Sequence, residues 1–133
     1  APARQPTAGD GRKVLVVDDN RDAAATLADL LEAMGYTTRV AHDGPNALRV
    51  AAEFDPELAL LDIGLPVMDG YELAQRLRGR PGGRPLRLVA VTGYGQEADK
   101  QRTREASFDA HMVKPVHVDH LQGVIRRLFP PPG

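Results

Sequence analysis

Polar side chains that could bind a metal or take part in a reaction follow apolar, strand-like runs at four places in the sequence. The pair Asp18-Asp19 follows the first run, Asp62 the second, Thr92 the third and Lys114 the last. Clustered carboxylates without histidine or cysteine are the oxygen ligands that Mg²⁺ prefers. A carboxylate beside a bound cation can attack a phosphoryl group, and a hydroxyl and an ammonium can hold the transferring oxygens. We therefore expect a Mg²⁺ site with a phosphoryl-accepting Asp62.

Each of these residues has a simpler explanation when it is taken alone. An acid pair after a strand commonly begins a helix, a threonine hydroxyl commonly closes a turn, and a lone lysine is commonly a solvated surface residue. The combination favours a site, because the carboxyl ends of parallel strands meet along the same edge of a sheet. Four polar positions at four strand ends would then face one another.

The rest of the chain supplies the elements that position these groups. Apolar runs predict strands over 13–17, 36–41, 58–61, 86–91 and 109–113, and helical spacing predicts helices over 20–34, 44–55, 71–78, 97–106 and 118–128. Such alternation predicts an α/β fold, a single doubly wound five-stranded parallel sheet with five helices on its two faces. The second and fifth strands are the more polar ones and suit the edges, which gives the order 2-1-3-4-5. The winding reverses between strands 1 and 3, so the acids should meet in that crevice.

The helix predicted over 97–106 has almost no apolar face. Only Ala98 and Ala106 are available for burial, and the other residues are largely charged or amide-bearing. A helix with so few apolar contacts should be weakly held and free to shift.

Length and composition set the class of protein. The chain has 133 residues, 42% hydrophobic and 26% charged, which indicates one globular domain. A net charge of −1 gives no electrostatic reason to expect nucleic acid as a partner, and the absence of cysteine excludes disulfides and thiolate chemistry. No apolar run approaches the roughly 20 residues that span a bilayer. We expect a flexible linker over 1–11 and a tail over 130–133, and, since no methionine begins the chain, excision from something longer.

Several motifs together resemble the receiver domain of two-component response regulators. The likeness extends over about residues 12–128, which predicts a receiver domain over 12–129, and its flavodoxin-like fold agrees with the predicted strand order. The matching motifs are Val16-Val17-Asp18-Asp19-Asn20, Leu61-Asp62-Ile63 with Pro66 and Met68-Asp69-Gly70, Ala90-Val91-Thr92-Gly93, and Val113-Lys114-Pro115.

The resemblance implies a role for each residue near the metal. Asp62 would be the phosphoacceptor. Asp19 and Asp62 would bind Mg²⁺ directly, Asp18 would bind it through water, and the backbone carbonyl of Gly64 would be the third protein ligand. The domain would be a phosphoacceptor with self-dephosphorylation, which leaves open whether it should be called an enzyme.

The resemblance also implies a switch. Thr92 would follow the phosphoryl group, and a cis peptide bond between Lys114 and Pro115 would direct the lysine to the phosphate. Many receivers carry a switching tyrosine or phenylalanine three residues before the lysine, where this chain has His111. Two interpretations stay open: His111 moves with Thr92, or its imidazole is purely structural.

The second half of the sequence looks most like the receivers of hybrid sensor histidine kinases. The similar stretches are 93–96 and 107–116, and we expect no output domain on this chain, because no residues of the sequence predict one. The first interpretation is therefore the terminal receiver of a hybrid kinase, and the alternative is a stand-alone response regulator. The implied partners are a histidine kinase or a histidine phosphotransfer domain. The domain would be cytoplasmic, free or as part of a membrane-bound kinase, without membrane contact of its own, and its oligomeric state is open.

A different class of protein shares part of this chemistry. A phosphohydrolase of the haloacid dehalogenase type also forms an aspartyl phosphate, but its nucleophile ends the first strand in an Asp-x-Asp pattern. Here the first strand ends in Asp18-Asp19-Asn20. A flavin-binding flavodoxin would need a glycine- and hydroxyl-rich phosphate loop at the same place, where two acids would repel the phosphate.

Overall fold

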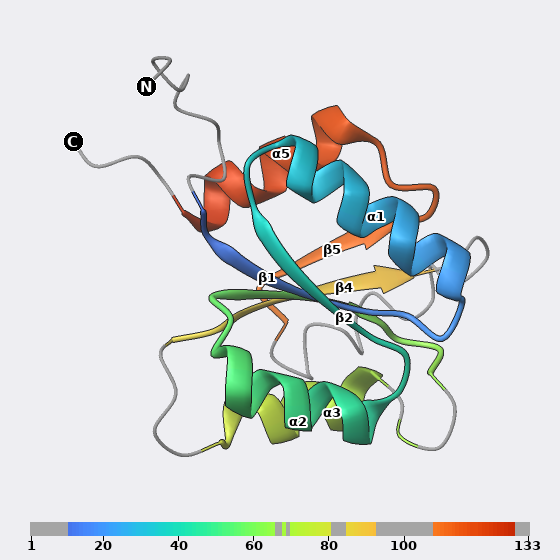
Figure 1. The fold of residues 1–133 in the computed structure, drawn as a ribbon, viewed down its shortest axis with the longest axis vertical. Coiled ribbons are helices and arrows are strands. Elements are labelled where there is room, and N and C mark those ends of the chain that lie inside the picture. Colours follow the sequence, from blue (N-terminus) through green and yellow to red (C-terminus); the bar gives the residue numbers. More distant parts are fainter. Residues whose placement is uncertain (1–10, 66–67, 69, 81–84, 93–107, 130–133) are drawn as a thin grey trace.

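The computed structural model describes residues 11–65, 68, 70–80, 85–92 and 108–129. Strands and helices alternate along the chain (Figure 1). The strands are β1 (Lys13–Val17), β2 (Thr37–Ala41), β3 (Leu58–Asp62), β4 (Arg87–Thr92) and β5 (Ala110–Val113). The helices are α1 (Arg21–Ala33), α2 (Gly44–Phe54), α3 (Gly70–Arg78) and α5 (Val118–Leu128). The helix predicted over 97–106 lies outside the described residues, as do the predicted linker, except Gly11, and the predicted tail.

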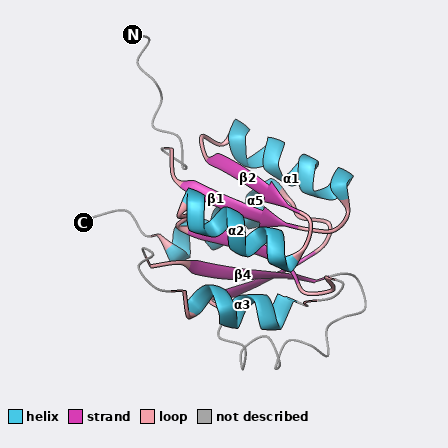
Figure 2. Ribbon diagram, turned by 60° about the horizontal axis from the view of Figure 1, so that its bottom comes forward, coloured by secondary structure: helices cyan, strands magenta, loops and turns pink. Residues whose placement is uncertain are grey.

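The five strands form one parallel sheet in the order β2-β1-β3-β4-β5. This is the predicted order, and the two more polar strands lie at its edges. Figure 2 shows the strands side by side, with β2 at one margin. The register pairs Val17 of β1 with Ala41 of β2 and with Leu61 of β3, so these three strands end at nearly the same level. The residues that follow β1, β2 and β3 are therefore brought together.

Alternate residues of the inner strands enter two separate cores. Val14 and Val16 of β1 pack toward α1 and α5, whereas Leu15 and Val17 pack toward α2 and α3. Figure 1 shows the same division, with α1 and α5 on one face of the sheet and α2 and α3 on the other. Because β3 is buried on both faces, its last residue, Asp62, is fixed by the core on either side.

Side-chain caps begin the two helices that follow β1 and β2. Asn20 Oδ1 accepts a hydrogen bond from the Ala23 amide at 3.0 Å, and Asp43 Oδ1 accepts one from the Asn46 amide at 2.8 Å. Such caps satisfy amides that the first helical turn leaves unpaired. Both caps lie within a few residues of a strand end, so they also fix the chain where it leaves the sheet.

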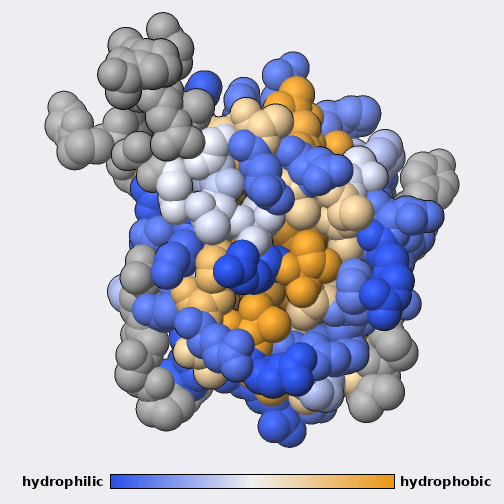
Figure 3. All heavy atoms as spheres, viewed as in Figure 1, coloured by the Kyte–Doolittle hydropathy of each residue, from blue (hydrophilic) through white to orange (hydrophobic). Residues whose placement is uncertain are grey.

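Apolar side chains are mostly enclosed. Among the described residues, Val118 is the one large apolar side chain that is more than a third exposed, at 38%. Figure 3 shows hydrophilic residues around the margin of one face and apolar residues grouped near its centre. Within the described part of the chain, no helix has the length and apolar character to cross a membrane.

Candidate active site

Three carboxylates converge at the carboxyl edge of the sheet. Asp18 and Asp19 follow β1, and Asp62 is the last residue of β3, the neighbouring strand. One oxygen from each lies within 4.8 Å of the others. Asp18 and Asp62 are buried, whereas Asp19 is exposed. The structure thus brings together the three acids that the sequence singled out.

Asp18 is held at every polar atom. Its amide donates to the Ala41 carbonyl at 3.1 Å, and its own carbonyl lies 2.9 Å from Nδ1 of His42. Its carboxylate accepts the Asn20 amide at 2.9 Å through Oδ1 and contacts Lys114 Nζ at 2.9 Å through Oδ2. Asp18 therefore has a fixed position at the side of the crevice.

Asp62 is less fully satisfied. Its Oδ1 accepts the Gly64 amide at 2.9 Å, and its Oδ2 lies 3.5 Å from Lys114 Nζ. Burial raises the pKa of the Asp62 carboxyl above its ordinary value, the Gly64 hydrogen bond and the Lys114 charge oppose the rise, and Asp18 adds to it. An added cation would relieve the repulsion between these carboxylates.

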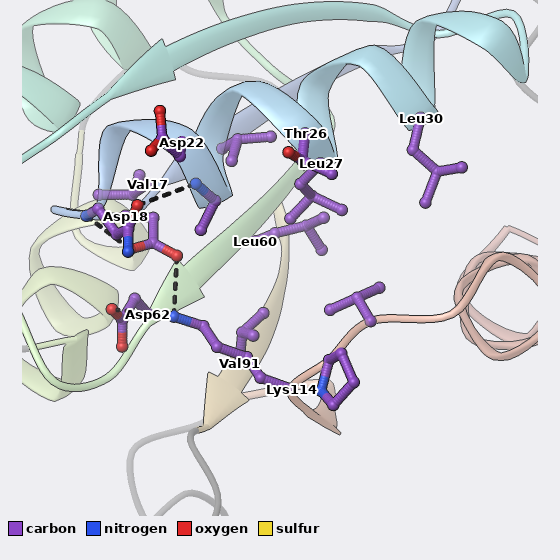
Figure 4. Close-up of a pocket in the computed structure, with 15 residues that line it drawn as sticks. Val17, Asp18, Asp22, Thr26, Leu27, Leu30, Leu60, Asp62, Val91 and Lys114 are labelled. Atoms are coloured by element: carbon purple, nitrogen blue, oxygen red, sulfur yellow. Dashed lines mark hydrogen bonds and ion pairs between the residues drawn. The ribbon is translucent and has the colours of Figure 1, made fainter.

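Lys114 reaches the crevice from the edge of the sheet that β5 forms. It follows β5, and Figure 4 shows its side chain extending toward Asp18, beside Asp62. Burial by itself would lower the pKa of the Lys114 ammonium, but the hydrogen bond to Asp18 and the charges of Asp62 and Asp18 outweigh it and raise the pKa. The Lys114–Pro115 peptide bond is cis.

The Thr92 hydroxyl is turned toward β5. Thr92 is 1% exposed at the end of β4, and its Oγ1 lies 3.1 Å from Nε2 of His111 and 3.4 Å from the Met112 carbonyl. The structure therefore places the two predicted switch residues, Thr92 and His111, in direct contact. The loop that follows Thr92 is outside the described residues.

The donor set fits a hard divalent cation. Three carboxylates without a nitrogen or sulfur ligand suit Mg²⁺, which is bound by few carboxylates and keeps several waters. Asp19 is exposed and can accept a partly hydrated ion. Gly64 is also exposed, two residues beyond Asp62, where its backbone is accessible to a ligand. These are the residues that would hold the ion.

A cavity of about 560 Å³ extends from the acids along α1. Asp18, Asp62 and Lys114 border it, and Leu27 and Leu30 of α1 contribute apolar wall. Figure 4 shows these two leucines on the side of α1 that faces the cavity. The acid crevice therefore opens into an apolar groove.

Sequence reasoning missed two groups of residues near the site. His42 contacts the Asp18 carbonyl, and only the fold brings residues 24 positions apart together. The other group involves glycines. A Cβ on Gly70 would lie 2.6 Å from Ile63 Cα and 2.9 Å from the Asp62 carbonyl, and a Cβ on Gly44 would lie 2.7 Å from Met68 Sδ. The sequence motif contains Gly70, but the close backbone contacts that require a glycine at this position become visible only in the fold.

Comparisons with known proteins identify relatives over most of the chain. The family model for the response regulator receiver domain matches residues 14–126. Sensor histidine kinase RcsC of Escherichia coli strain K12 is 38% identical over 113 residues, which are 85% of this chain and 12% of that protein. The chain thus spans about an eighth of that relative. The polar-differentiation response regulator DivK of Brucella ovis is 35% identical over 115 residues, which are 86% of this chain and 94% of that protein.

Solved structures agree with this assignment. A putative response regulator from Chloroflexus aurantiacus J-10-fl superposes with a TM-score of 0.82 at 29% identity, covering 89% of this chain and 97% of that one. The receiver domain of sensor histidine kinase PA1611 from Pseudomonas aeruginosa PAO1 gives a TM-score of 0.78 at 28% identity, covering 88% and 96%. That structure has a magnesium ion coordinated in its active site cleft.

Proposed function

Because the chain belongs to the response regulator receiver domain family, we propose that its Asp62 accepts a phosphoryl group from a phosphohistidine. The donor is a histidine kinase or a histidine phosphotransfer domain. The observation that carries the proposal is the convergence of Asp62 with Asp18, Asp19 and Lys114 at one sheet edge. The family assignment favours this function over the phosphohydrolase alternative.

In the proposed step, a carboxylate oxygen of Asp62 forms a bond to phosphorus while the bond from phosphorus to the donor imidazole breaks. The imidazole leaves with the electron pair, and the product is an acyl phosphate. Lys114 is near enough to Asp62 to neutralise a phosphoryl oxygen, at 3.5 Å from the carboxylate. Its ammonium therefore stabilises charge that develops beside Asp62.

Asp18, Asp19, Asp62 and the backbone carbonyl of Gly64 would hold Mg²⁺, with Asp18 acting through water. When bound, the ion supplies positive charge next to Asp62, which lowers the repulsion that an incoming phosphoryl group meets. Asp18 remains anchored by its amide and carbonyl, so it can orient a ligand water without moving. The magnesium ion in the PA1611 receiver domain supports this assignment.

Phosphorylation also acts on Thr92 in this proposal. The Thr92 hydroxyl contacts His111 and the Met112 carbonyl, so it must leave these partners to reach a phosphoryl oxygen. That movement breaks the contact between Thr92 and Nε2 of His111, and the imidazole follows the threonine. The surface around β5 would then change for a partner protein.

For the parent protein, we propose the receiver of a hybrid sensor histidine kinase, acting in the cytoplasm. The likeness to the RcsC sensor kinase supports it. A stand-alone regulator is the second candidate, because the likeness to DivK extends over 94% of that protein. The phosphoryl chemistry at Asp62 is the same in both cases.

The experiment is incubation of the chain with Mg²⁺ and acetyl phosphate, a small phosphodonor, followed by intact-mass spectrometry. We expect a gain of one phosphoryl group that is lost on acid or base treatment, as an acyl phosphate is. A matched sample with EDTA in place of Mg²⁺ should gain none. Equal labelling in both samples would reject the role of the metal, and no labelling in either would reject the proposal.

A further inference from the structure

We propose that the connection between β2 and α2, residues His42, Asp43 and Gly44, is a positioning element that sets the spacing of the acids across the crevice. This inference rests on the proposed function for its consequence, metal binding, but its structural part can be tested without metal. The connection carries none of the three acids. It nevertheless contacts the loop that carries Asp18 and Asp19, through His42, and the connection that follows Asp62, at Gly44.

The first contact is the hydrogen bond between His42 and the backbone of Asp18. Nδ1 of His42 lies 2.9 Å from the Asp18 carbonyl oxygen. A carbonyl oxygen can only accept, so Nδ1 carries the proton and donates it. The Asp18 amide is bound to Ala41, the residue just before His42, at 3.1 Å. Both backbone polar groups of Asp18 are therefore hydrogen-bonded to the end of β2 and the residue that follows it.

These hydrogen bonds also restrain Asp19. The Asp18 carbonyl belongs to the peptide group that leads into Asp19, and that group is planar. Fixing the carbonyl direction therefore fixes the orientation of the peptide from which Asp19 projects. Asp19 is exposed, so core packing among the described residues does not hold it in place. His42 supplies the restraint that packing does not.

The second contact is steric and involves the loop after Asp62. Gly44 is the first residue of α2, and Asp43 caps that helix through the Asn46 amide. A Cβ on Gly44 would lie 2.7 Å from Sδ and 2.8 Å from Cβ of Met68. Real Cβ atoms do not approach this closely, and the Met68 Cβ cannot turn away without a backbone shift. Met68 therefore packs against α2 only because residue 44 lacks a side chain.

Together the two contacts connect the halves of the crevice through a third loop. The carboxylates of Asp18 and Asp62 repel each other, and without a restraint the loops would tend to separate. Mg²⁺ requires a near-octahedral arrangement of ligands at short distances, so a small change in the spacing of the carboxylates weakens Mg²⁺ binding. His42 and Gly44 are accordingly positioning residues for the metal site, not ligands of it.

The metal-free test uses two substitutions at His42. In His42→Asn, the amide Nδ2 is attached to Cγ as Nδ1 is in histidine, so it can donate to the same carbonyl. In His42→Leu, a methyl group takes that place. We expect the Asp19 amide resonance in ¹H–¹⁵N spectra to shift in His42→Leu and to stay near its wild-type position in His42→Asn. An unmoved Asp19 amide in folded His42→Leu protein would overturn the positioning role, whatever the metal does.

The metal-dependent test is the Mg²⁺ dissociation constant from calorimetric titration of the same 133-residue variants. Loss of a residue that orients a metal ligand commonly costs about tenfold in affinity or more. We expect that loss for His42→Leu and near-wild-type affinity for His42→Asn. Wild-type affinity in His42→Leu would overturn the inference. Absence of Mg²⁺ binding in the wild-type chain would instead reject the proposed function, while a shifted Asp19 amide would still uphold the positioning of the backbone.

The steric contact has its own matched pair of variants. Gly44→Ala introduces the clash with Met68, whereas a Cβ on Gly123, in the middle of α5, meets no atom within 4 Å. We expect Gly44→Ala to weaken Mg²⁺ binding several-fold and to shift the Gly64 amide, and Gly123→Ala to do neither. Thermal melts show whether each variant is folded. A folded Gly44→Ala protein with unchanged Mg²⁺ affinity would remove Gly44 from the positioning element.

Discussion

The Lys114 ammonium lies 2.9 Å from Oδ2 of Asp18 and 3.5 Å from Oδ2 of Asp62, so a cation of the chain itself bridges the two acids. The lysine follows β5, at one edge of the sheet, and reaches past β4 to the ends of β3 and β1. It thereby offsets part of the repulsion that a bound Mg²⁺ would also offset. The lysine and the metal should therefore be partly interchangeable for stability.

Lys114→Met should lower the free energy of unfolding of the metal-free chain by about 1 kcal/mol, since it leaves the acids without their cation. Added Mg²⁺ should then stabilise this variant more than it stabilises the wild type. Urea unfolding with and without Mg²⁺ measures both effects. Lys13→Met, at the opposite end of the sheet, is the control, and it should not enlarge the increase in the free energy of unfolding that Mg²⁺ produces. An increment no larger in Lys114→Met than in the wild type would contradict this view of the lysine.

Asp19→Ala should raise the Mg²⁺ dissociation constant more than about tenfold, because Asp19 is proposed as a direct ligand, not merely as a residue that orients one. Asp22→Ala is the matched control. Asp22 lies in the first turn of α1 and borders the same cavity, but it is not one of the three converging acids. Calorimetric titration should separate the two variants. Equal losses would mean that general negative charge attracts the ion, and no loss in Asp19→Ala would remove Asp19 from the site.

The switch should appear in amide hydrogen exchange. Beryllofluoride, a phosphoryl mimic, should draw Thr92 from His111 and alter protection over 92–106 and around His111 more than in α1 and α2. Lys114→Ala should still accept some phosphoryl group but lose this response. Thr92→Val, which keeps the shape and lacks the hydroxyl, should also lose it. Changes confined to the loop after Asp62 would mean that the domain only stores phosphate, and the switch would be withdrawn.

Tyr36 offers a test of the fold at high pH. Its side chain is 4% exposed and its hydroxyl has no hydrogen-bond partner among the described residues. Burial raises the pKa of the Tyr36 phenol, with Arg12 and then Arg126 opposing the rise. The folded chain thus holds this proton more tightly than the unfolded chain. The contribution of this group to the free energy of unfolding is therefore fully present below the pKa of tyrosine in the unfolded chain, about 10. It is lost as the pH rises from there through the higher pKa of Tyr36 in the folded chain.

Tyr36→Phe should remove that part of the alkaline loss. At pH 7 it should be neutral or stabilising by up to about 1 kcal/mol, because the removed hydroxyl is buried without a partner. Denaturant unfolding of both chains from pH 7 to above pH 10 measures the difference. A variant clearly less stable than the wild type at pH 7 would show that the hydroxyl has a stabilising partner.

The sequence predicted the sheet and its acids because both depend on local pattern. Continuous apolar runs identify β1, β3 and β4 as buried strands, and the more polar β2 and β5 fall at the edges, which determines the strand order. Once that order is known, the ends of β1 and β3 must lie side by side. The grouping of Asp18, Asp19 and Asp62 could therefore be predicted from the sequence.

Contacts across the crevice could not be predicted in the same way. Nothing in the sequence indicates that Lys114 lies nearer to Asp18 than to Asp62, since this depends on the course of the chain after β5. The bond from His42 to the Asp18 carbonyl depends on a backbone atom, which has no signature in the sequence. The space that Met68 takes above Gly44 depends on how α2 approaches the β3–α3 connection.

The most direct test of the central claim is the mass of the Asp62→Asn chain after incubation with Mg²⁺ and acetyl phosphate. Asparagine keeps the size and much of the hydrogen bonding of the carboxylate but cannot act as the nucleophile. Thr92→Val, changed at the end of the adjacent strand with Asp62 intact, is the parallel sample and should still gain a phosphoryl group. We expect one added phosphoryl group on the wild-type chain and none on Asp62→Asn. An equally labelled Asp62→Asn chain would contradict it and would place the nucleophile on another residue.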